Sequence, residues 1–139
     1  MSLTDFYDRV TDKSGPVAGA IIVIPISFDD VANSETVEWS WTPPAGMKVT
    51  IVSAHVRAST FASDPSLTIG KTIGGSQVAA PVNVTTNLGN LTLKAAGLDV
   101  SSSDILNVRV VADSGDSAED VSVTLVAYVS APPTSLRYR

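Results

Sequence analysis

The fold is decided by residues 105–129, which read ILNVRVVADSGDSAEDVSVTLVAYV. From Val121 to Val129 apolar residues occupy every other position, which is the period of a strand with one buried face. Residues 105–112 form a second run that is rich in valine and favours a strand. The Asp, Ser and Gly residues at 113–118 are typical of turns. The stretch therefore predicts two strands joined in a hairpin.

The same succession of strands and turns extends towards the N-terminus. In one of these segments Trp39 and Trp41 are two residues apart, so both lie on the same face of the strand. Pro25 cannot donate a hydrogen bond to a neighbouring strand, and it therefore marks a bulge or a sheet edge. The segments in which strands are expected are residues 20–28, 36–41, 48–58, 64–80 and 88–95.

The expected fold class is all-β, a single-domain antiparallel β-sandwich with jelly-roll-like topology and about eight strands. An α/β fold is excluded because no long amphipathic helix separates the strands. The length of 139 residues suits one domain. The expected parts are an N-terminal arm at residues 1–17, the sandwich at 18–130 and a C-terminal tail at 131–139. The core is expected to contain Val37, Trp39, Val121, Val123, Leu125 and Val129.

The two ends of the chain carry large apolar side chains. Residues 2–10 predict a short helical arm, with a possible cap at Ser2 and apolar residues at helical spacing. A helix this short is marginal alone, so it needs a surface to lie on. We expect one or both ends to dock on a neighbouring subunit. The residues expected in this interface are Leu3, Phe6, Tyr7, Leu136 and Tyr138.

Composition excludes several classes of function. The chain has no cysteine, so disulfides, zinc–thiolate sites and cysteine nucleophiles are excluded. The net charge of −5 argues against a nucleic-acid partner and against binding to an anionic membrane. The most apolar stretch, residues 16–28, is too short to span a bilayer. The first residues lack a basic region followed by an apolar run, so we expect no signal peptide and synthesis in the cytoplasm.

No set of residues predicts an active site or a cofactor. His55 is the one histidine, and it lies within an expected strand, whereas catalytic groups favour loops. Residues 70–72 read GKT, the ending of a phosphate-binding loop, but the required first glycine is replaced by Pro65 and no helix follows. We therefore expect that the chain is not an enzyme and binds no cofactor.

Two weaker ligand sites remain open. Asp113, Asp116, Glu119 and Asp120 could supply oxygen ligands to calcium, although a solvated hairpin tip explains them more simply. Trp39 and Trp41 could stack on sugar rings, although burial in the core is the simpler interpretation. A carboxylate pair for glycoside hydrolysis has no distinctive candidate.

Three segments carry a resemblance to a known family. Residues 41–60 read WTPPAGMKVTIVSAHVRAST, a Gly- and Thr-rich middle follows, and residues 97–130 read GLDVSSSDILNVRVVADSGDSAEDVSVTLVAYVS. A polar turn, an aspartate and then Ile-Leu-x-Val precede the last two strands, as at Asp104–Val108. Residues 36–130 thereby resemble the small β-sandwich virion proteins of tailed bacteriophages, of the capsid decoration or minor head type.

The resemblance implies a structural role and supplies no catalytic residue. It implies location in the virion after synthesis in the host cytoplasm, a homo-oligomer such as a dimer or trimer, and contacts with the major capsid protein or other virion proteins. The few charges agree with this role, since Lys and Glu are depleted at protein interfaces. The alternatives are a carbohydrate- or host-surface-binding module of a phage fibre or spike and, less favoured, a β-sandwich hydrolase.

Overall fold

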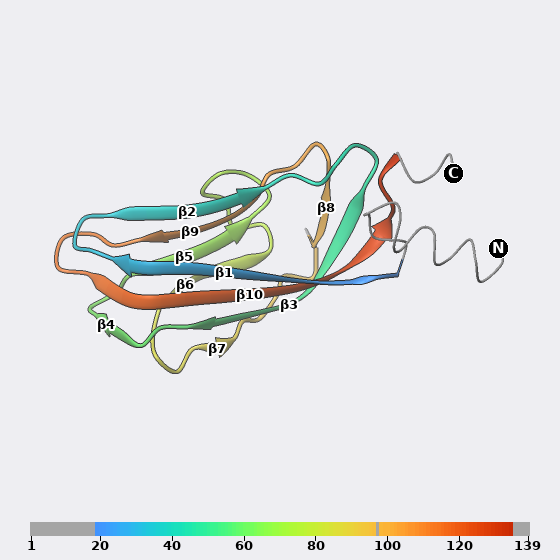
Figure 1. Cartoon of the computed structure of the whole chain (residues 1–139). Helices are drawn as coiled ribbons and strands as arrows, with labels where there is room; N and C mark the ends of the chain where they lie inside the picture. The colour runs from blue at the N-terminus through green and yellow to red at the C-terminus, as the bar shows by residue number, and fades with distance from the viewer. Residues whose placement is uncertain (1–18, 97, 135–139) are drawn as a thin grey trace.

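The computed structural model describes residues 19–96 and 98–134, which form ten β-strands in two antiparallel sheets (Figure 1). The all-β class is confirmed. The strands are β1 (Ile21–Val31), β2 (Thr36–Trp41), β3 (Lys48–Arg57), β4 (Thr60–Ala62), β5 (Ser66–Gly70), β6 (Ala79–Asn83), β7 (Gly89–Asn90), β8 (Asp99–Ser101), β9 (Leu106–Val111) and β10 (Ser117–Ala131). No helix within these residues is long and apolar enough to cross a membrane.

The strand pairs are nested along the chain. In the six-stranded sheet the order is β1-β10-β3-β7, with β4 also beside β10 and β8 beside β3. In the four-stranded sheet the order is β2-β9-β5-β6. The first strand therefore pairs with the last, β2 with β9, β3 with β8, and β5 with β6. The chain behaves as one long antiparallel ribbon that is folded over so that successive pairs lie in opposite sheets.

A single apolar core lies between the two sheets. The inward residues of β9, Leu106, Val108 and Val110, are fully buried in the same cluster as the inward residues of β10. Every other residue of β10 from Val121 to Val129 is buried, as the alternation predicts. The expected core residues Val121, Val123, Leu125 and Val129 are therefore confirmed.

The expected core residues on β2 are only half-buried. Val37 and Trp39 face inward and pack against the core, but they remain partly exposed. The reason is position, because β2 is the edge strand of its sheet and has a neighbour on one side only, β9. Pro25 occupies an edge as expected, since β1 is the edge strand of the other sheet.

The expected hairpin at residues 105–129 is wrong. β9 belongs to the four-stranded sheet and β10 to the six-stranded sheet, so the connection at residues 112–116 crosses between sheets. The connection from β1 to β2 crosses beside it, and the Ser34 N–H donates to the Asp113 carbonyl at 3.3 Å. Both β9 and β10 have one apolar face, and this pattern is the same whether a turn returns to one sheet or crosses to the other.

The strand expected at residues 88–95 is shorter than predicted. Only Gly89–Asn90 pairs as a strand, on β3. Beyond it Leu91 and Leu93 are half-buried against the core, and Leu93 forms a single bridge with Ala79. Leucines that pack on a core from irregular backbone produce the same local pattern as a short strand.

The C-terminal end of the described chain is fixed to the body of the protein. The Thr134 N–H donates to the Ala45 carbonyl at 2.8 Å, and Pro133 is buried. Ala45 belongs to the turn between β2 and β3, in which the Met47 N–H donates to the Pro44 carbonyl at 2.9 Å. The predicted N-terminal arm and residues 135–139 of the tail lie outside the described residues.

Candidate functional site

An exposed apolar patch lies on the outer face of the six-stranded sheet. Strand register places Ile21 opposite Tyr128 and Val23 opposite Val126, on neighbouring strands β1 and β10. Val52 lies on the next strand, β3, at an irregularity in its pairing with β10. The exposed fractions are 65% for Ile21, 58% for Val23, 47% for Val52 and 37% for Tyr128. We define the terminal patch as these four residues together with Val126: Ile21, Val23, Val52, Val126 and Tyr128.

The terminal patch lies at the end of the molecule where β1 begins and β10 ends (Figure 1). At this end β1 and β10 extend beyond β2 and β9 (Figure 1), but the inward residues of β10 there, Ala127 and Val129, are buried. The inward residues Ile22 and Ile24 lie on the edge strand β1 and are only half-buried. Four successive apolar residues of β1 thus remain partly open to solvent. An exposed apolar group of this kind is typical of a surface that binds another protein.

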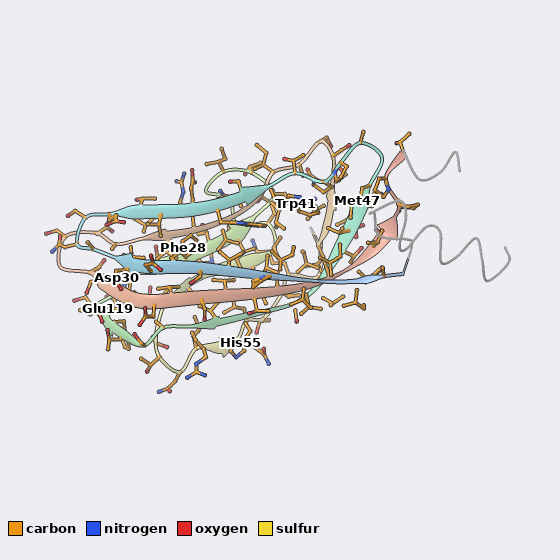
Figure 2. The ribbon with its side chains drawn as sticks, viewed as in Figure 1. Phe28, Asp30, Trp41, Met47, His55 and Glu119 are labelled. Carbon is orange, nitrogen blue, oxygen red and sulfur yellow. The ribbon has the colours of Figure 1, made fainter. Side chains whose placement is uncertain are left out.

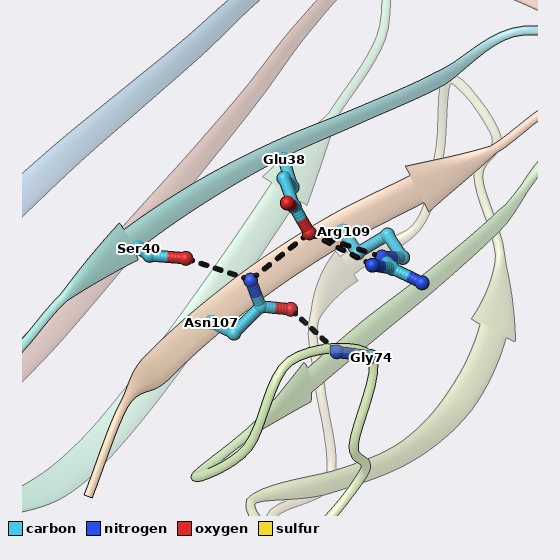
Figure 3. Close-up of polar contacts among 5 residues, drawn as sticks. All are labelled: Glu38, Ser40, Gly74, Asn107 and Arg109. Atoms are coloured by element: carbon cyan, nitrogen blue, oxygen red, sulfur yellow. Dashed lines mark hydrogen bonds and ion pairs between the residues drawn. The ribbon is translucent and has the colours of Figure 1, made fainter.

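A polar cluster occupies the outer face of the four-stranded sheet (Figure 3). Asn107 is fully buried, and its side-chain amide donates to the Ser40 hydroxyl at 2.8 Å and to Glu38 at 3.3 Å. Its carbonyl oxygen accepts from the Gly74 N–H at 2.9 Å. Glu38 also accepts two hydrogen bonds from Arg109, at 3.0 and 3.2 Å. The cluster therefore joins β2, β9 and the loop at residues 71–78.

The cluster has the chemistry of a structural tie. Hydrogen bonds from Arg109, and next those from Asn107, lower the pKa of the Glu38 carboxyl below its ordinary value of 4.5. A carboxylate held ionised in this way is a poor proton donor at neutral pH. Every polar group of the Asn107 side chain has a partner within the protein, so the amide has no vacant position for a substrate. Sequence reasoning missed this cluster, and its one signal is an asparagine within the valine-rich β9.

The acidic residues at positions 113–120, in the connection before β10 and in the first part of β10, do not gather into a metal site. Asp116 accepts the N–H groups of Asp113 and Asp64, both at 3.1 Å, and Asp120 accepts the Ser59 hydroxyl at 3.0 Å. Glu119 is exposed and lies opposite Asp30 in the strand register (Figure 2). Within residues 19–96 and 98–134 no three His, Cys, Asp or Glu residues are grouped so that they could hold a metal ion.

The remaining candidates from the sequence are placed separately. Trp39 and Trp41 face the core side of β2 and are half-buried, an arrangement that favours packing over stacking on a ligand. His55 is a half-buried residue on β3, opposite Thr124 on β10 (Figure 2). The ammonium group of Lys71, in the GKT sequence, donates a hydrogen bond to the Asp99 carbonyl at 3.1 Å. None of these lies in the polar cluster or in the terminal patch.

The interface candidates Leu3, Phe6, Tyr7, Leu136 and Tyr138 lie outside the described residues. The described chain begins at Gly19, on the C-terminal side of Leu3, Phe6 and Tyr7, and it reaches the terminal patch at Ile21. Sequence reasoning placed the interface on the chain ends and did not identify this patch. Comparison with protein-family models, with curated proteins and with solved structures finds no match to this chain.

Proposed function

We propose that this chain is a non-enzymatic structural protein of a bacteriophage virion, which decorates or stabilises the capsid as a homo-oligomer through protein–protein contacts. The observation that carries the proposal is the terminal patch. Its five residues come from three adjacent strands, so the patch is a continuous surface on a rigid sheet. Burying such side chains against a neighbour stabilises an assembly by about 1.5–3 kcal/mol for each side chain that is fully buried.

The strand topology supports the same proposal. We infer that the nested pairs form a jelly roll, with β4 as an additional short strand and with β7 and β8 sharing one position beside β3. Jelly rolls occur in viral capsid proteins and in lectins. Fold alone does not decide between such functions, so the surface must do so.

The surface favours the structural role over the alternative. Exposed Trp39 and Trp41 in a groove would favour a carbohydrate- or host-surface-binding module of a fibre or spike, and both tryptophans face inward on β2. The polar cluster is satisfied internally, which favours a non-enzymatic role. Major capsid protein and other copies of this chain are the proposed partners.

The test is co-expression of the chain with the major capsid protein of the same genome, followed by purification of the particles. We expect the chain to co-purify with the capsids. The Val23→Asp variant should bind them at least tenfold more weakly, because it places a charge in the terminal patch. Ile73→Asp is the matched control, since Ile73 is 56% exposed but lies outside the patch. Absence of the wild-type chain from the particles would refute the capsid role.

A further inference from the structure

We propose that the terminal patch is the docking surface for the N-terminal segment, residues 2–17, of a second copy of this chain. The inference rests on the proposed assembly role and names the partner of the same surface. The reciprocal arrangement is a two-fold dimer in which each copy inserts its segment onto the patch of the other.

The dimensions of the patch and of the segment agree. The patch crosses three adjacent strands, which at the usual strand spacing is about 10 Å wide. Residues 2–10 as a helix would be about 13 Å long. Their apolar residues Leu3, Phe6, Tyr7 and Val10 recur at helical spacing and therefore share one face. An amphipathic helix of this size can cover the patch with its apolar face and leave its charged residues in solvent.

The chain enters the sheet beside the patch. The Gly19 N–H donates to the Val129 carbonyl at 2.7 Å, and the Val129 N–H donates to the Ala20 carbonyl at 2.9 Å. Ile21 follows at once and belongs to the patch. The segment is thus joined to the chain at the end of the molecule that carries the patch, where β1 begins (Figure 1).

Chain direction favours a neighbour over the same copy. β1 runs from the patch into the body of the molecule, so a segment covering its own patch would have to reverse direction within residues 11–18. A segment that crosses to a copy facing it needs no reversal. Those eight connecting residues span at most about 27 Å when extended, which is enough to cross between two sheets in contact.

The apolar character of β1 favours such a partner. Ile21 and Val23 are exposed on one face, and Ile22 and Ile24 are half-buried on the other. β1 is also an edge strand, so one side of its backbone has no neighbouring strand among the described residues. An apolar edge of this kind invites uncontrolled pairing unless it is covered. Once one segment of the dimer has docked, the second docks at high effective concentration and covers the other patch.

The experiment uses two full-length variants, alone and mixed. The segment variant carries Phe6→Asp and Tyr7→Asp, and the patch variant carries Ile21→Asp and Val23→Asp. Each should be at least tenfold weaker than wild type in self-association, measured by analytical ultracentrifugation. An equimolar mixture should form a one-to-one heterodimer, because the intact segment of the patch variant can dock on the intact patch of the segment variant.

Other occupants of the patch give different results. If the segment variant self-associates as strongly as wild type, the patches or the β1 edges pair directly and the proposal is wrong. A mixture that remains monomeric would also overturn it. The proposal is equally wrong if the wild-type protein is a monomer and the segment variant has a lower melting temperature, since the segment would then cover its own patch. Ile73→Asp controls for added charge. Because Ile21 and Val23 are exposed, the patch variant should fold, and the milder Val23→Ser checks the result.

Failure of the two proposals can be told apart. If the heterodimer forms but wild-type protein does not co-purify with capsids, the docking inference stands and the capsid role is wrong. If wild-type protein and the segment variant bind capsids and self-associate equally well, the capsid role stands and the segment is not the occupant.

Discussion

Replacing Asn107 with alanine should destabilise the protein and release one particular loop. The side chain is fully buried and bonds to Gly74 on the loop at residues 71–78 and to Ser40 on β2. Each of these neutral hydrogen bonds contributes about 0.5–1.5 kcal/mol, so their loss should cost about 1–3 kcal/mol in the free energy of unfolding. The contact with Glu38 is left out of this sum because that side chain is 40% exposed and solvent screens it.

Urea denaturation measures the effect, with the fluorescence of the two tryptophans as the signal. With a denaturant slope of about 2 kcal/mol/M, the transition midpoint should fall by about 0.5–1.5 M. Limited trypsin digestion at Lys71 gives a local readout. The Lys71 N–H donates to Gln77 within the same loop, and an open loop exposes this site to cleavage. Asn107→Ala should therefore be cut at Lys71 faster than wild type.

Thr68→Val is the matched control on the same sheet face. The Thr68 hydroxyl is buried and has no hydrogen-bond partner in the structure. Replacing it with a methyl group should leave stability unchanged or raise it by about 1 kcal/mol, because a buried unpaired polar group is unfavourable. Trypsin cleavage should stay at the wild-type rate. If Asn107→Ala changes neither the midpoint nor the cleavage rate, the loop is held by other contacts and the reasoning fails.

Four further predictions concern the core, a turn, pH and calcium. Leu125→Ala should cost about 2–5 kcal/mol in a urea melt, because this side chain is fully buried, and a loss near zero would contradict its central position. Gly46→Ala should lower the melting temperature, since Gly46 has φ of 78° and an added methyl group would collide with Thr134, whereas an unchanged melting temperature would show that this turn adapts. The lowered pKa of Glu38 favours the folded state above the unfolded pKa, so stability should fall as acid is added below about pH 4.5, and less steeply in Glu38→Gln. Millimolar calcium should leave the melting temperature unchanged, because the Asp116 and Asp120 carboxylates already accept hydrogen bonds and no three acidic groups of the described residues converge, and a shift of several degrees that a chelator reverses would refute this.

The sequence predicts strands well wherever one face is buried. The alternation from Val121 to Val129 gives the correct face for each residue, because burial on one side of a sheet repeats every two residues. It does not give the partner strand, since the crossing at residues 112–116 and a hairpin turn use the same residues. The pairing of β1 with β10 joins opposite ends of the chain, and no local pattern contains this information.

The terminal patch could be predicted from the sequence only in part, for a related reason. The apolar run at residues 20–28 is typical of a strand that is covered on both sides, and the structure leaves Ile21–Ile24 partly open on both. The difference depends on the position of β1 at the edge of its sheet, which is a property of the whole fold. The cluster around Asn107 likewise depends on Glu38, which lies on another strand and far away in the sequence.

The nested pairing also constrains how the protein can fold. β1 is the first described strand to be synthesised, and its partner β10 is the last. Its apolar residues therefore have no strand to pair with until β10 has left the ribosome. Contacts between such distant residues close slowly, so we expect folding on the order of milliseconds to seconds, as in other β-proteins of high contact order. During that interval β1 is the segment most exposed to aggregation, and chaperone binding should concentrate there.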